Sequence, residues 1–96
     1  MADARIVNWH PHLTVANPDW VQDVVEHDRV YATDRERMAL AVTLSRENVR
    51  RGTGGPFGAA VFERGGALVA VGVNSVVRSG NCVLHAETMA LMMAQH

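Results

Sequence analysis

The sequence contains no lysine, one cysteine and only 5% aromatic residues, and each shortage narrows what the protein can be. All nine basic residues are arginine, and ten acidic residues balance them to a net charge of −1. That balance excludes the broad basic surface with which many proteins neutralise nucleic-acid phosphates. A single cysteine forms no disulfide framework, no apolar run approaches the roughly 20 residues of a membrane span, and the N-terminus lacks a signal-peptide core. We therefore expect a cytoplasmic protein that binds no membrane and for which nucleic acid is not the main partner.

The residues that are present suffice for one small domain. The chain has 96 residues, 48% hydrophobic and 20% charged, which is the composition of a globular protein. We divide it into an N-terminal arm with a short helix, residues 1–32, and the first half of a larger domain, residues 33–96. Asn17 and Pro18 predict the cap and first residue of a helix over about 18–27. The side chains expected to point inward from this helix are Trp20, Val21, Val24 and Val25.

The strongest helix signal begins at Thr33. Thr33 and Glu36 form a capping-box pattern, in which the hydroxyl and the carboxylate each satisfy a backbone N–H group. The predicted helix continues to Arg51, and Gly52 ends it. Its predicted buried side consists of Met38, Ala41, Val42 and Val49. Its predicted solvent side consists of Arg35, Glu36, Arg46, Glu47 and Arg50.

Two apolar runs, 57–62 and 67–73, are joined by the turn sequence 63–66 and predict a β-hairpin. Because both runs are almost continuously apolar, we expect helices on both faces of the sheet. Residues 74–82 read as a loop, and residues 85–96, with Ala, Met and Leu on every side, predict a buried helix. The fold class is therefore α/β with three α/β/α layers. Since an isolated hairpin is marginal, further strands are expected from residues beyond these or from a partner chain.

The residues with the clearest chemical potential are His85 and Glu87, where the loop becomes the last helix. In the middle of a helix, residues two apart point about 200° apart, but at an irregular first turn they can converge. A neutral imidazole there can ligate zinc, and a nearby carboxylate can carry a proton from water to a substrate nitrogen. The same pattern is compatible with an ordinary helix start, where the dipole favours Glu87 and His85 lies in the cap region.

The stretch from Gly54 to Gln95 resembles the first half of the cytidine deaminase superfamily, the zinc-dependent nucleoside and nucleobase deaminases. The matching parts occur in the family's order: a helix, Pro-Phe-Gly-Ala opening a strand, a hairpin, an Asn after the second strand, and His-Ala-Glu-x-x-Ala-Leu on a helix. The Pro-Phe-Gly-Ala opening, Asn74 and the Ser-Gly-Asn loop are most similar to the guanine deaminase branch, followed by the tRNA adenosine deaminases.

This resemblance implies Zn²⁺ as the cofactor, His85 as a zinc ligand and Glu87 as the catalytic proton shuttle. The substrate-binding residues that it implies are Asn74, Ala86 through its backbone N–H, Phe57 and Gly58. The expected enzyme is a hydrolase that converts guanine and water to xanthine and ammonia, takes a small nucleobase as substrate and forms a homodimer. The family's second motif, Pro-Cys-x-x-Cys, does not occur among the 96 residues, so two of the three protein ligands of zinc are not among them.

Two other functions stay open. One is a deaminase acting on adenosine in tRNA, on cytosine or on another nitrogen heterocycle; the other is an inactive fragment or scaffold that binds a partner through an open sheet edge. Cys82, three residues before His85, is expected to be a small buried hydrophobe and not a ligand. His10 and His12 read as chance histidines on an exposed arm, and residues 52–55 as a helix stop, because they lack the lysine of a phosphate-binding loop.

Overall fold

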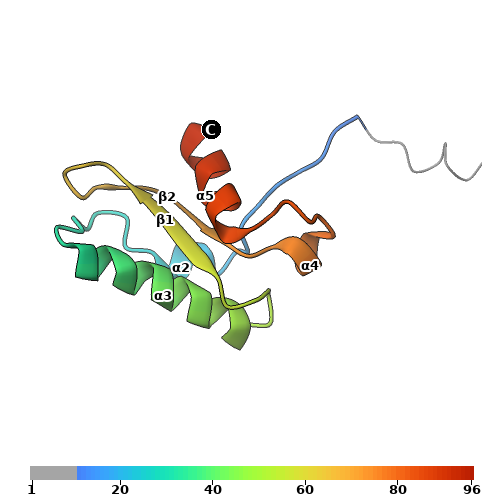
Figure 1. The fold of residues 1–96 in the computed structure, drawn as a ribbon, viewed down its shortest axis with the longest axis horizontal. Helices are drawn as coiled ribbons and strands as arrows, with labels where there is room; N and C mark the ends of the chain where they lie inside the picture. The colour runs from blue at the N-terminus through green and yellow to red at the C-terminus, as the bar shows by residue number, and fades with distance from the viewer. Residues whose placement is uncertain (1–10) are drawn as a thin grey trace, which may run out of the picture.

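The computed structural model describes residues 11–96, which place a two-stranded antiparallel sheet between helices (Figure 1). The elements in chain order are α2 (Val21–Val24), α3 (Asp34–Arg50), β1 (Gly58–Phe62), β2 (Leu68–Val73), α4 (Val76–Ser79) and α5 (Ala86–Gln95). In Figure 1, α3 lies on one side of the hairpin and α5 on the other, so the three-layer α/β/α arrangement is confirmed in this part of the chain.

The hairpin has the predicted position, and its register is continuous except at one point. Gly58 pairs with Val73 and Phe62 with Leu68, with an irregularity after Val61. The turn closes where the Gly66 N–H donates to the Glu63 carbonyl at 2.9 Å. Each strand begins one residue later than the apolar run that predicted it.

The helices α3 and α5 each approach the sheet closely at a glycine. A Cβ atom at Gly58 would lie 2.6 Å from the Ala41 carbonyl oxygen of α3, and one at Gly72 would collide with Ala86 and Ala90 of α5. Backbone therefore packs against backbone at both positions. Because these glycines belong to different strands and face different helices, the two faces of the hairpin are covered independently.

The main hydrophobic core lies between α2, α3 and the hairpin. Tyr31 is 2% exposed, and its ring centroid is 5.2 Å from that of Phe62. Its N–H also donates to the Gly66 carbonyl at 2.8 Å, which ties the segment before α3 to the hairpin turn. The buried residues of this core are Trp20, Val21, Val25, Tyr31, Leu40, Leu44, Val71 and Val73.

The Thr33 hydroxyl caps α3 as predicted, whereas the Glu36 carboxylate accepts from the side chains of Thr33 and Arg29 and not from a backbone N–H as predicted. The Thr33 hydroxyl accepts from the Glu36 backbone N–H at 3.2 Å and donates to the Glu36 carboxylate at 3.0 Å. The helix ends one residue earlier than predicted, with Arg51 as its C-cap and Gly52 following at a φ of 70°.

The predicted buried side of α3 is wrong. Met38, Val42 and Val49 are 64%, 43% and 52% exposed, and Ala41 is half-buried. The buried residues are Leu40, Leu44 and Asn48. Apolar residues occur on two stripes of this helix, and only the position of β1 and α2 decides which stripe enters the core.

The first helix is shorter than the predicted 18–27, and Asn17 does not cap it. The cap position is Trp20, whose side chain makes no capping hydrogen bond. Asn17 instead donates from Nδ2 to the Val71 carbonyl at 3.0 Å and accepts from the Val73 N–H at 3.3 Å. The side-chain amide of Asn17, which was expected to cap the helix, thus hydrogen-bonds to unpaired backbone groups at the edge of β2. The predicted inward side chains are buried at Trp20, Val21 and Val25 and half-buried at Val24.

Two predictions near the C-terminus also change. The expected loop over 74–82 contains the one-turn helix α4, which ends at Gly80 in a left-handed conformation. In α5 only Ala86, Met89 and Ala90 are buried, whereas Leu91 is 53% exposed. The helix is not buried all round, because β2 and β1 cover one of its sides in residues 11–96. None of the helices in these residues is long and apolar enough to cross a membrane.

Candidate functional site

The open end of the hairpin brings three of the predicted substrate-binding residues together. Asn74 directly follows β2, and its backbone N–H donates to the carbonyl of Phe57 at 3.1 Å. Phe57 directly precedes β1, whose first residue, Gly58, pairs with Val73. Ladder pairing of the two strands therefore places Asn74 beside the start of the Pro-Phe-Gly-Ala segment.

The start of α5 is tied to the same end of the sheet. The backbone N–H of Ser75 donates to the Leu84 carbonyl at 2.9 Å, and Leu84 directly precedes His85. Ser75 is fully buried, and its hydroxyl donates to the Val73 carbonyl at 3.0 Å. Arg78 of α4 donates to the Ser75 oxygen at 2.6 Å. The hydrogen bond between Ser75 and Leu84 therefore joins the chain directly after Asn74 to the chain directly before His85.

His85 and Glu87 stand at the helix start that the sequence predicted for them. His85 is the N-cap of α5 with φ −69° and ψ 159°, which is extended backbone, and Glu87 is the second helical residue. Both side chains are exposed, whereas Ala86 is buried. The backbone N–H of Ala86 belongs to the first turn, where N–H groups have no partner within the helix. His85 lies outside the regular helix, so the opposed directions of mid-helix residues do not apply to this pair.

The donor set fits one part of a zinc site. The His85 side chain makes no capping hydrogen bond, so an imidazole nitrogen is available to a metal ion. Within residues 11–96, no three His, Cys, Asp or Glu side chains are placed to hold a metal together. A catalytic zinc takes three protein ligands and water. His85 would supply one of them, and residues 11–96 do not place two others beside it.

The other candidate ligands add nothing to this site. Cys82 is exposed in the turn before α5, so the expectation that it is buried is wrong. It lies in a surface turn because α4 and Gly80 lead the chain away from the core. His12 is exposed, and His10 lies outside the described residues.

A hollow of about 180 Å³ lies between α3 and the start of β1. Phe57 and Gly58 line it, but Asn74, His85 and Glu87 do not. The residues that line this hollow are Met38, Ala41, Val42, Ser45, Pro56, Phe57 and Gly58. Phe57 therefore contacts Asn74 through its backbone, while its ring, in a residue that is 58% exposed, borders a separate hollow.

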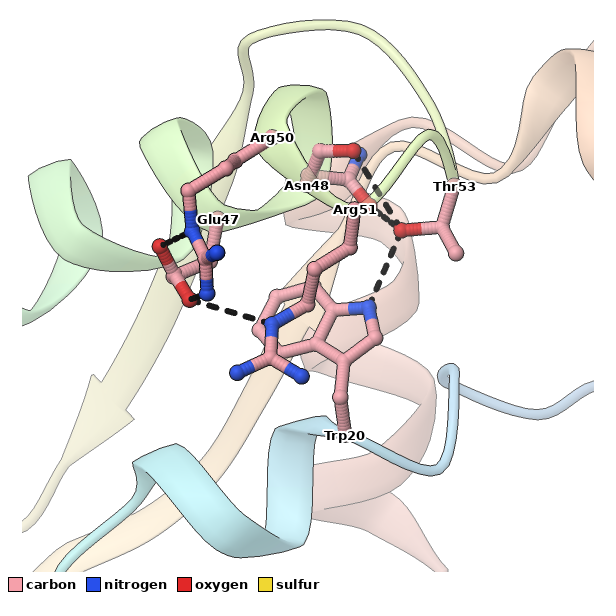
Figure 2. A network of polar contacts seen from close by, with 6 residues as sticks. All are labelled: Trp20, Glu47, Asn48, Arg50, Arg51 and Thr53. Atoms are coloured by element: carbon pink, nitrogen blue, oxygen red, sulfur yellow. Dashed lines mark hydrogen bonds and ion pairs between the residues drawn. The ribbon is translucent and has the colours of Figure 1, made fainter.

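Asn48 is a residue at this site that the sequence reasoning missed (Figure 2). It is fully buried on α3, and its Nδ2 donates to the carbonyls of Gly55 at 2.9 Å and Asn74 at 3.0 Å. Its Oδ1 accepts from the Thr53 hydroxyl at 2.7 Å. The available signal was its spacing, because Asn48 continues the buried stripe of α3 at four-residue intervals.

Residues 31–96 match the family described as the cytidine and deoxycytidylate deaminase zinc-binding region. The chain is also 48% identical over 54 residues to a guanine deaminase of Bacillus subtilis. That alignment covers 56% of this chain and 34% of the relative, so the chain spans about a third of the length of this curated relative.

Solved structures give the same likeness in three dimensions. A guanine deaminase from Nitrosomonas europaea is 37% identical and superposes with a TM-score of 0.80. A second structure, a variant crystallised with 8-azaguanine, is 36% identical with a TM-score of 0.79. Each match covers 92% of this chain and 48% of the solved chain. The chain therefore spans about half the length of these solved relatives.

Proposed function

The chain belongs to the cytidine and deoxycytidylate deaminase zinc-binding family, and from that premise we propose that the protein is a hydrolytic guanine deaminase. The observation that carries the proposal is that both the sequence and the structure comparisons match guanine deaminases. The family match over residues 31–96 includes the Pro-Phe-Gly-Ala segment, Asn74 and His-Ala-Glu. A relative crystallised with 8-azaguanine, a close analogue of guanine, supports the same substrate class.

The proposed reaction replaces the exocyclic amine of guanine with oxygen. A water oxygen bonds to the carbon that carries the amine, the carbon–nitrogen bond breaks, and xanthine and ammonia leave. Zinc, when bound, supplies the Lewis acidity that makes water a nucleophile near neutral pH, with His85 as one of its ligands. Glu87 accepts the two protons of the attacking water one after the other, and delivers the first to the ring nitrogen and the second to the departing amine.

Asn74 reads the base edge in this proposal. An amide side chain donates and accepts at once, which suits the mixed donor and acceptor edge of guanine. The backbone of Asn74 makes two hydrogen bonds, to Phe57 and Asn48, so the Cα from which its side chain extends is fixed in position. The N–H of Ala86 at the start of α5 is the further contact to the substrate.

Ammonia release from a panel of bases tests the activity. We expect the zinc-loaded full-length protein to deaminate guanine faster than adenine, cytosine or cytidine. Glu87→Gln should keep the fold and the zinc while kcat falls by about 10²- to 10⁴-fold, the usual contribution of general acid–base catalysis. The matched control is Glu63→Gln, the same change at an exposed position before the hairpin turn.

Each contrary result is specific. Faster release from cytidine or adenine would move the protein to another branch of the same family. No release from any base in a protein with a full zinc content would favour the scaffold alternative. Near-normal turnover of Glu87→Gln would remove Glu87 from the mechanism while leaving the substrate assignment intact.

We also propose that the full-length protein is a cytoplasmic homodimer. The exposed apolar residues Met38, Val42 and Val49 on α3 support an interface, and a single exposed cysteine suits a reducing compartment. Light scattering should give twice the mass of one chain, and cell fractionation should place the protein with soluble cytoplasmic markers. A monodisperse monomer would contradict the dimer.

A further inference from the structure

We propose that Asn48 is a positioning residue for guanine recognition, which holds the backbone of Asn74 through a hydrogen-bond chain that begins at Trp20 and passes through Thr53. The inference rests on the proposed function, because it assigns Asn48 a role through the residue that reads the base. Asn48 touches neither substrate nor metal in this proposal.

The chain of hydrogen bonds has one consistent direction (Figure 2). The indole N–H of Trp20 can only donate, and it donates to the Thr53 oxygen at 3.0 Å. The Thr53 proton is then free to be donated to Asn48, whose Oδ1 at 2.7 Å is the nearer acceptor and whose backbone carbonyl lies at 3.3 Å. With Oδ1 engaged by a donor, Nδ2 faces two carbonyl oxygens, which can only accept. The amide of Asn48 therefore has a single satisfied orientation, and its donors point at Asn74 and Gly55.

Gly54 allows the backbone of Asn74 to come this close. A Cβ atom at Gly54 would lie 2.6 Å from Asn48 Nδ2 and would collide with the Asn74 carbonyl. Any side chain at this position would have to displace either the amide or the carbonyl that it binds. The glycine loop after α3 thus serves the contact between Asn48 and Asn74.

Trp20, where the series of hydrogen bonds begins, is itself held in place by Arg51. The guanidinium of Arg51 lies 5.3 Å from the centre of the Trp20 ring, and its Nε donates to Glu47 Oε1 at 3.0 Å. Arg50 binds the same carboxylate, with Nε 2.7 Å from Oε2. Trp20 is 8% exposed, so its ring is packed on one side by the core and bordered on the other by Arg51 (Figure 2).

Loss of the Asn48 amide should therefore act on recognition as well as on stability. The Asn74 backbone is held by Phe57 on its N–H and by Asn48 on its carbonyl, so removal of one bond leaves it free to move. A misplacement of about 1 Å can cost on the order of 10²-fold in rate when it lies beside the reacting atoms. A shift of the Asn74 Cα would move its side chain, so the hydrogen bonds from that side chain to the base edge would have poorer geometry.

A double-mutant cycle between Asn48 and Asn74 tests this, with KM and kcat for guanine and the Kd of 8-azaguanine measured on the zinc-loaded full-length protein. Asn48→Ala should raise KM and Kd by about 5- to 150-fold, the effect of one lost buried polar contact. In the Asn74→Ala background the same change should alter them by less than about twofold, because the contact it supports is already gone. Thr53→Val should raise KM by about 2- to 10-fold in the same direction.

Thr43→Val is the matched control, because it is the same substitution on the exposed side of α3, and it should leave KM unchanged. Zinc content and Tm are measured for every variant. If Asn48→Ala does not fold, Thr53→Val takes its place in the cycle with Asn74→Ala. Trp20→Phe, which removes the indole donor together with one ring, is measured beside it.

The outcomes separate this inference from the proposed function. Two results would give Asn48 a structural role only, so that this inference fails alone. In the first, Asn74→Ala weakens binding and the fold-changes of the two single variants in KM and Kd multiply in the double variant. In the second, Asn48→Ala lowers Tm without changing KM. If Asn74→Ala leaves both KM and Kd unchanged, or wild-type protein does not act on guanine, the proposed function fails and the inference falls with it.

Discussion

At the scale of single residues, Gly72 decides how closely α5 can lie against β2. A Cβ atom there would be 2.7 Å from the Met89 Cβ and would also collide with the backbone of Ala86 and Ala90. Backbone atoms cannot rotate away as a flexible side chain can. We expect Gly72→Ala to lower the free energy of unfolding by about 1–3 kcal/mol, the usual cost of overpacking.

Urea denaturation measures this cost, and Gly65→Ala is the matched control, because a Cβ at Gly65 meets nothing within 4 Å. The Gly72 variant should also disturb the candidate site, since His85 is the N-cap of α5 and Glu87 lies in its first turn. Equal stability of the two variants would mean that α5 moves away from β2 at no cost.

At the scale of elements, α3 depends on its N-terminal cap. Thr33→Ala removes the oxygen that accepts from the Glu36 N–H, and this should lower the free energy of unfolding by about 0.5–2 kcal/mol. Thr33→Ser keeps the hydroxyl and should restore most of the loss. Equal urea midpoints for the Ala and Ser variants would show that the cap contributes nothing.

The C-terminal end of α3 depends on charge. Hydrogen bonds from Arg50 and Arg51 lower the pKa of Glu47 from 4.5 to about 2. Because the folded pKa is below the unfolded one, the ion pairs stabilise the fold fully above pH 4.5, and this stabilisation is lost as the pH falls towards 2. Glu47→Gln should therefore be less stable than wild type at pH 7, with a gap that closes between these two pH values.

Urea denaturation across that pH series checks the expectation, with Glu63→Gln as the exposed control. Added salt should narrow the gap at pH 7, because both partners of Glu47 are reached by solvent. A gap that stays the same at every pH would mean that the carboxylate acts by packing and not by charge.

At the scale of the whole molecule, the 96-residue chain offers His85 as its proposed zinc ligand and exposes much apolar surface in residues 11–96. We expect this segment, purified alone, to keep no stoichiometric zinc after dialysis and to show no deaminase activity, because one imidazole does not hold zinc tightly. Large exposed apolar patches promote association. In the part of the chain that the structure describes, the large apolar residues that are more than half exposed are Leu13, Val30, Met38, Val49, Phe57, Val77, Val83 and Leu91.

Metal analysis and light scattering on the purified segment measure both properties. Association to dimers or larger species is the expected result. One tightly bound zinc in a monodisperse monomer would contradict both the ligand set and the surface argument.

Local chemistry was enough to predict the order of the main elements and the position of His85 at a helix start. The Thr33 cap, the turn sequence of the hairpin and the position of His85 at a helix start depend on residues close together in the chain, and each was found where predicted. The family resemblance rests on the same short segments.

Only the tertiary structure decided the roles of Asn17 and Asn48 and the buried side of α3. Asn17 binds the edge of β2 across 54 residues, and Asn48 binds Asn74 across 26. An amide can cap a helix, bind a strand edge or hold a loop with equal local chemistry. Which of these it does depends on the backbone groups that packing brings to it, and those groups lie far away in the sequence.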